Sequence, residues 1–215
     1  ANHKDELRRD VQVAFWQAHE NGIMEGSTWF VDHYWDEIDR GMIGYINIDS
    51  PGMKYATAYE ATLSPELWTM HEALMQAALG YVTPPKRLAK TGDQSFFGVG
   101  VPAISGRMDF SKELLERWHG AVLGPWYQST DDTMDVADKE VLAQDIRMTM
   151  AYAWEFATRP VLPYDFRHNA RILREALESY AGAADDTLGL DVTVELAREF
   201  ERKAGKVYER ADALQ

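Results

Sequence analysis

Met42-Ile43-Gly44-Tyr45-Ile46-Asn47-Ile48 is an apolar run that ends at a polar turn, Asp49-Ser50-Pro51-Gly52. A short apolar run bounded by turn residues is typical of a buried strand. Two similar runs, over 11–16 and 99–104, predict two further strands, and segments with helical spacing lie between the three. Strands that alternate with helices favour an α/β fold, in which helices sandwich a mostly parallel or mixed sheet.

Start and stop signals delimit the helices that we expect between and after these strands. Ser64-Pro65 is a cap residue followed by proline at the first helical position, and the pattern that it opens runs to about Gly80. The predicted helices cover 27–41, 64–80, 111–119, 138–158, 167–181 and 191–213. Because prolines at 160 and 163 interrupt this series, we predict an α/β domain over 1–160 and a helical segment over 161–215.

Three strands are few for an α/β domain that carries this many large apolar residues. A sheet of three would leave two edges unpaired, and unpaired edges invite pairing with another chain. We therefore expect the three strands to be part of a larger sheet, completed by a second polypeptide or covered in a homo-oligomer.

Composition and charge exclude several classes of function. The 215 residues carry 22 Lys and Arg against 35 Asp and Glu, so the net charge of −13 disfavours nucleic acid as a partner. The chain contains no cysteine, which excludes disulfide scaffolds, cysteine-bound zinc and thiol catalysis. No apolar run is long enough for a membrane span and no signal peptide is visible, so the cytoplasm is the default compartment.

Polar residues follow each of the three predicted strands. His19-Glu20 comes after the first, Asp49 after the second and Ser105-Gly106-Arg107 after the third. Ligands of open α/β sheets bind outside the carboxyl ends of the strands, and carboxylates and imidazoles are the ligands that hold divalent metals without cysteine. The alternative for each residue is a structural role as a loop cap or a surface turn.

Four stretches in order resemble one family of enzymes. They read FWQAHENG followed by GSTW at 15–29, YINIDS at 45–50, GDQSFF to GVPA at 92–103, and WYQSTDDT at 126–133. The chain is similar in these segments to the co-catalytic zinc exopeptidases, which include aminopeptidases, glutamate carboxypeptidase and the transferrin-receptor ectodomain. The resemblance covers about residues 10–160, the C-terminal part of a peptidase domain, and 170–213 resembles the start of the helical dimerisation domain that follows it.

The resemblance implies roles for six residues. Glu20 and Asp49 match zinc ligands, and Gln128 stands where active members have a ligand histidine. His19 stands at the position of the general-base glutamate, and Arg107 matches an arginine near the substrate pocket. Asp132 is implied as a residue that orients the loop of Gln128. Two further ligands, in an H-x-D … D-N pattern upstream, have no match, so we expect the peptidase domain to be incomplete on its N-terminal side.

His19 and Gln128 depart from the family pattern, and an amide oxygen is a poor zinc ligand compared with imidazole. Our leading hypothesis is a metal-dependent hydrolase of amide or peptide bonds, with up to two zinc ions, acting as one subunit or fragment of a composite enzyme. The alternative is a catalytically inactive peptidase-like subunit or binding module with a degenerate metal site. A third possibility is a non-peptidase reaction with one metal.

Overall fold

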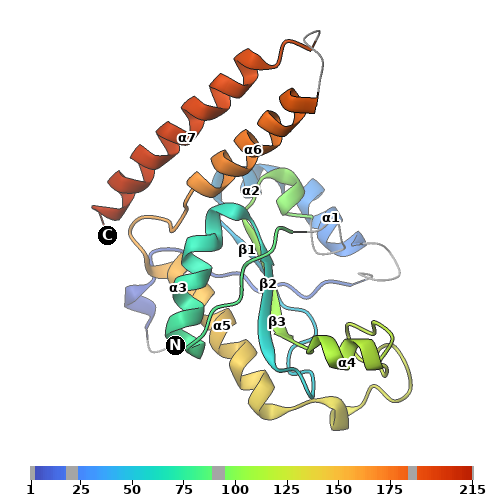
Figure 1. Cartoon of the computed structure of the whole chain (residues 1–215). Helices are drawn as coiled ribbons and strands as arrows, with labels where there is room; N and C mark the ends of the chain where they lie inside the picture. Colours follow the sequence, from blue (N-terminus) through green and yellow to red (C-terminus); the bar gives the residue numbers. More distant parts are fainter. Residues whose placement is uncertain (1–2, 18–23, 89–94, 184–187, 215) are drawn as a thin grey trace.

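The computed structural model describes residues 3–17, 24–88, 95–183 and 188–214. It is an α/β structure with a helical hairpin at one end (Figure 1). The predicted fold class is therefore confirmed, including the mixed sheet and the helical segment that follows it.

The sheet has three strands in the order β1-β3-β2. β1 (Tyr45–Asn47) runs parallel to β3 (Ala103–Asp109), whereas β2 (Ala58–Leu63) runs antiparallel to it. β2 was not among the predicted strands. Its residues alternate strictly between buried and half-buried, as expected for a strand with one face on a core.

One predicted strand is absent, and another is shifted along the chain. Residues 11–16 form no strand, and Val11, Val13 and Phe15 are 59%, 74% and 92% exposed. No described strand pairs with this segment, and an apolar run without a hydrogen-bonding neighbour does not form a sheet. The third strand begins later than predicted, at Ala103, because Phe97–Val99 is a 3-10 helix ending at Gly100 with φ 90°.

The later start of β3 also changes where its polar residues lie. Ser105, Gly106 and Arg107 are inside β3 and not in a loop that follows it. Their side chains are therefore placed by the register of the sheet, which sets Ser105 opposite Asn47 of β1 and opposite Thr62 of β2.

The helices follow the predicted start and stop signals closely. α3 (Trp68–Leu79) follows a 3-10 turn at Pro65–Leu67 and ends at Gly80 in the left-handed conformation. α5 (Lys139–Thr158) begins with Asp138, whose carboxylate accepts the N–H groups of Glu140 and Val141. The predicted helix over 27–41 is two helices, α1 (Glu25–His33) and α2 (Trp35–Gly41), and α4 covers Lys112–Arg117.

The two faces of the sheet differ. α3 and α5 cover one face, where the main core gathers (Figure 1). A second, smaller core joins α1 and α2 to the segment after residue 95, and Tyr45 of β1 packs against it. The rest of the second face carries polar side chains and is called the polar face of the sheet.

The chain ends in an antiparallel hairpin of two long helices, α6 (Arg167–Ala183) and α7 (Asp191–Asp212). Small buried residues on α7, including Ala197 and Ala204, let the two helices pack closely. Ion pairs cross the hairpin, with Arg174 Nε 2.6 Å from Glu201 Oε2 and Arg198 Nη2 2.9 Å from Glu178 Oε1.

Candidate functional site

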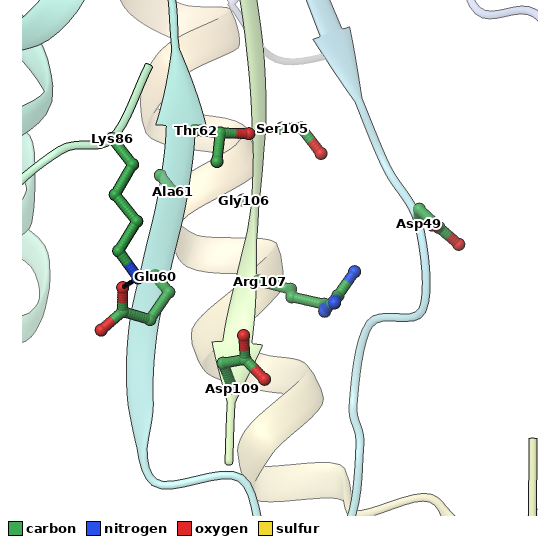
Figure 2. A pocket seen from close by; sticks show the side chains of 9 residues that line it. All are labelled: Asp49, Glu60, Ala61, Thr62, Lys86, Ser105, Gly106, Arg107 and Asp109. Atoms are coloured by element: carbon green, nitrogen blue, oxygen red, sulfur yellow. Dashed lines mark ion pairs between the residues drawn. The ribbon is translucent and has the colours of Figure 1, made fainter. Parts of the chain in front are cut away.

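A shallow hollow of about 120 Å³ lies on the polar face of the sheet (Figure 2). Because side chains alternate along a strand, the same register that buries Tyr59, Ala61 and Leu63 turns their neighbours to this face. The polar side chains that line the hollow are Asp49, Glu60, Thr62, Lys86, Ser105, Arg107 and Asp109. Acidic and basic groups therefore meet in one place, brought there by β1, β2, β3 and the segment at Lys86.

Asp49 lies two residues beyond the end of β1, at the carboxyl end of a strand that is parallel to its neighbour. The residue is half-buried, and its Oδ1 accepts a hydrogen bond of 3.0 Å from Ser50 Oγ. Ser50 has a φ of 51°, a left-handed conformation that is uncommon for residues other than glycine. This turn holds the Asp49 carboxylate at the rim of the hollow, where a ligand of an α/β sheet is expected.

Arg107 extends from the middle of β3 toward the segment that carries Asp49 (Figure 2). Its Nε is buried and has no hydrogen-bond partner in the described residues, and the same holds for Asn47 Nδ2. Asn47 Oδ1 accepts a bond of 3.0 Å from the Tyr45 hydroxyl, so the amide group is held with its donor side unpaired. Two unpaired donors on one face suit a ligand that brings acceptor oxygens.

Glu60 and Lys86 form an ion pair of 2.7 Å at the other side of the hollow (Figure 2). Glu60 also stands directly opposite Arg107 in the sheet register. The Lys86 pair partly neutralises Glu60. The charged groups of the hollow without an ion pair in the described residues are Asp49, Arg107 and Asp109, of which Asp109 accepts the Phe110 N–H at 2.8 Å.

Buried side chains behind the sheet fix this polar face. Asp145 of α5 accepts the N–H of Gly52 at 2.8 Å and the N–H of Met108 at 2.6 Å. Burial raises the pKa of its carboxyl, and the two hydrogen bonds oppose that rise in part. A single carboxylate thus joins the turn after Asp49 to the strand residue after Arg107.

The sequence prediction missed Asp145, although a signal was present. Val141, Met148, Tyr152 and Phe156 share the buried face of α5 with it, and an acid among such residues is rare unless its oxygens are satisfied.

Gln128 and Asp132 lie elsewhere, in the exposed loop between α4 and α5. Gln128 has a φ of 55°, and its Nε2 donates to the Tyr127 hydroxyl at 3.2 Å. The Asp132 side chain is exposed, while its backbone N–H donates to the carbonyl of Ser129 at 3.2 Å. Neither residue lines the hollow.

His19 and Glu20 lie outside the described residues. Within the described ranges, no three His, Asp or Glu side chains lie close enough together to hold a metal ion. The carboxylate of Asp49 suits zinc by its chemistry, whereas Gln128 offers an amide. The described residues thus do not supply a complete zinc site.

No protein-family model and no curated protein sequence matches the chain. Solved structures do resemble it. The zinc aminopeptidase BSAP of Bacillus subtilis has a TM-score of 0.55 at 19% identity over 70% of this chain and 36% of its own. The LapA aminopeptidase of Legionella pneumophila has a TM-score of 0.51 at 15% identity, over 67% of this chain and 39% of its own. An aminopeptidase from Aneurinibacillus sp. strain AM-1 is 27% identical over 67% of this chain and 32% of its own, at a TM-score of 0.49.

The two structures with the higher TM-scores show that the chain has a zinc-exopeptidase-like fold, as its sequence predicted. The chain spans about a third of the length of the structures it matches. A likeness at this level of identity concerns the fold. In addition, none of the helices in the described segments is both long enough and apolar enough to cross a bilayer.

Proposed function

We propose that this chain contributes metal ligands and substrate contacts to a metal-dependent hydrolase of amide or peptide bonds. One observation carries the proposal. In a chain with a zinc-exopeptidase-like fold, Asp49 follows a parallel strand and lines the same polar hollow as Arg107.

In this proposal Asp49 and Glu20 hold the zinc, whether one ion or two. Zinc, when bound, polarises the substrate carbonyl and makes water a stronger nucleophile. His19 accepts the proton of the attacking water, since its ordinary pKa lies near neutrality. Gln128 offers an amide oxygen from its loop, and Asp132 orients that loop.

Arg107 binds a carboxylate of the substrate in this proposal. The Arg107 guanidinium presents several N–H donors in one plane, which suits a carboxylate, and its Nε has no hydrogen-bond partner in the described residues. The role is one of orientation: a substrate held at Arg107 presents its amide bond toward the Asp49 side of the hollow.

The remaining ligands come from a second polypeptide or from a further copy of the chain. Two observations support this part of the proposal. The chain spans about a third of the aminopeptidases that share its fold, and β1 pairs on one side only in the described residues. The domain division that we propose places the peptidase-like part in 1–160 and a dimerisation-like hairpin in 161–215.

The test is peptide hydrolysis by protein purified under native conditions with everything that co-purifies, identified by intact mass. We expect hydrolysis that stops with a zinc chelator and returns with zinc. Asp49→Asn should lower it by about 100-fold or more, since even residues that only orient metal ligands are worth 10- to 100-fold. Asp39→Asn is the matched control, because Asp39 is exposed on α2 and does not line the hollow.

Hydrolysis that survives chelation, or full activity in the Asp49→Asn protein, would contradict the proposal. Steady peptide hydrolysis by a preparation that contains this chain alone would contradict the proposal of a composite enzyme. It would not contradict the role of Asp49 as a metal ligand.

A further inference from the structure

A line of hydrogen bonds joins α3 to the start of α6. The Thr69 hydroxyl, in the first turn of α3, lies 2.7 Å from Asp165 Oδ2 and 2.9 Å from His168 Nε2. The other ring nitrogen, His168 Nδ1, lies 3.1 Å from Arg171 Nη2. Four side chains therefore form one continuous line across the junction between the α/β body and the helical hairpin.

The donors and acceptors that each side chain offers fix the direction of every hydrogen bond in this line. The Thr69 hydroxyl has a single proton, and it donates that proton to the Asp165 carboxylate. His168 Nε2 must therefore donate to the Thr69 oxygen. Arg171 can only donate, so His168 Nδ1 must accept. The line is satisfied by one protonation state of the ring, the neutral imidazole with its hydrogen on Nε2.

Asp165 is the fixed acceptor at the end of the line. Its side chain is 1% exposed, and Arg167 donates to it from both Nε at 2.8 Å and Nη2 at 2.7 Å. Burial alone would raise the pKa of Asp165, but the bonds from Arg167 and Thr69 outweigh burial and lower it. Asp165 therefore stays charged in mildly acidic solution, and His168 is the member of the line that changes state.

We infer that His168 is an acid-sensitive latch, which holds the first turn of α6 against α3 when the ring is neutral and releases it when the ring is protonated. A second proton on the ring sits on Nδ1 and points at the Arg171 guanidinium. Two donors and two positive charges then face one another, so the Arg171 bond breaks and the ring turns away from Thr69.

Charged groups from both elements face His168. From the α6 side these are Asp165, with Oδ2 3.6 Å from Nε2, together with Arg167 and Arg171, and Glu72 faces it from α3. Burial lowers the pKa of His168 most, Asp165 and Glu72 raise it, and the two arginines lower it. The net effect is a lowered pKa, so the latch is closed at neutral pH and opens as the pH falls through that lowered pKa.

Release is local, because other contacts at the junction do not involve the ring. Asn169 Nδ2 donates to Glu66 Oε2 at 2.8 Å, and the Asp165 N–H donates to the Glu66 carbonyl at 2.8 Å. These bonds keep the hairpin attached while the first turn of α6 loosens.

Hydrogen exchange of the full chain at pH 7.5 and pH 5.5, corrected for intrinsic rates, tests the latch. We expect the 166–171 amides to lose about tenfold more protection than the α5 amides between pH 7.5 and pH 5.5, the size of one charge-assisted hydrogen bond. His168→Gln should abolish the change, since its amide can donate to Thr69 and accept from Arg171 without titrating. His33→Gln, at an exposed histidine on α1, should leave the change intact.

A second measurement does not depend on any variant. Nitrogen chemical shifts of His168 at pH 7.5 should report a neutral ring with its hydrogen on Nε2. A hydrogen on Nδ1, or a charged ring at pH 7.5, would overturn the inference. So would an acid-induced loss of protection that persists in His168→Gln, or one that affects α5 equally and so reports global unfolding.

Discussion

Single residues in the sheet and behind it decide whether its polar face can form. Gly106 is one of them, because the Tyr59 ring lies against it: a Cβ at Gly106 would be 2.5 Å from the Tyr59 hydroxyl. Tyr59 itself is buried, and burial raises the pKa of its hydroxyl. Since Gly106 sits between Ser105 and Arg107, the packing of one glycine sets the position of both polar neighbours.

Gly106→Ala should therefore lower the free energy of unfolding by about 1–3 kcal/mol, the usual cost of an overpacked core. Urea unfolding followed by tryptophan fluorescence would measure it. Gly98→Ala is the control, because a Cβ at Gly98 meets nothing within 4 Å. Equal unfolding midpoints for the two variants would show that the Tyr59 contact is not as tight as described.

His71 makes the fold sensitive to acid. Its ring is fully buried in α3, Nδ1 lies 2.6 Å from the Tyr152 hydroxyl, and Nε2 has no partner in the described residues. Burial lowers the pKa of His71 to about 4. The unfolded chain, with a histidine pKa of about 6.5, binds this proton more readily, so acid favours unfolding.

Above pH 6.5, His71 should not lower the free energy of unfolding. Between pH 6.5 and pH 4, its titration should lower that free energy by up to about 3 kcal/mol. His71→Gln should flatten that slope, whatever its effect at pH 7.5, whereas the exposed His33→Gln should not. Unfolding free energies at pH 7.5, 6 and 5 decide the matter, and an unchanged slope in the His71→Gln protein would contradict the assignment.

Among the elements, the helices were predictable because their signals are local. The cap at Asp138, the proline at 65 and the glycine at 80 each act through residues within one turn. Strands depend on distant partners. β2 exists because β3 pairs with it in antiparallel register, and 11–16 is no strand because no described neighbour pairs with it. Neither the pairing of β2 nor the lack of a partner for 11–16 can be predicted from the residues of the segment itself.

The packing of α7 on α6 gives a prediction at this scale. Ala204 is 4% exposed on a helix that meets α6 along its length, so the interface has room for a methyl group and little more. Ala204→Leu should push the helices apart and lower the stability of the hairpin by about 1–3 kcal/mol. Lys206→Leu, at an exposed position of the same helix, is the matched control.

Hydrogen exchange in α6 and α7 would measure the change element by element. Faster exchange confined to the two helices in Ala204→Leu is the expected result. Unchanged exchange in that variant, or equal acceleration by Lys206→Leu, would mean that Ala204 does not lie in a close-packed contact.

At the scale of the whole molecule, the sequence predicted more of the fold than of the site. Four short motifs predicted a zinc-exopeptidase-like fold, and solved aminopeptidases confirm it. Of the candidate residues, Asp49 and Arg107 meet at one hollow, while Gln128 and Asp132 lie in a separate exposed loop. The meeting of Asp49 with Arg107 depends on the pairing of β1 with β3, which spacing along the chain does not determine.

The most direct test of the proposed site is zinc content. Elemental analysis of protein purified under native conditions, with Asp49→Asn and Asp39→Asn prepared alongside, compares zinc per chain in the three samples. We predict near-stoichiometric zinc in the unaltered and Asp39→Asn proteins and a loss of most of it in Asp49→Asn. Equal zinc in all three samples, or none in the unaltered protein together with its co-purifying chains, would contradict the role of Asp49 as a metal ligand.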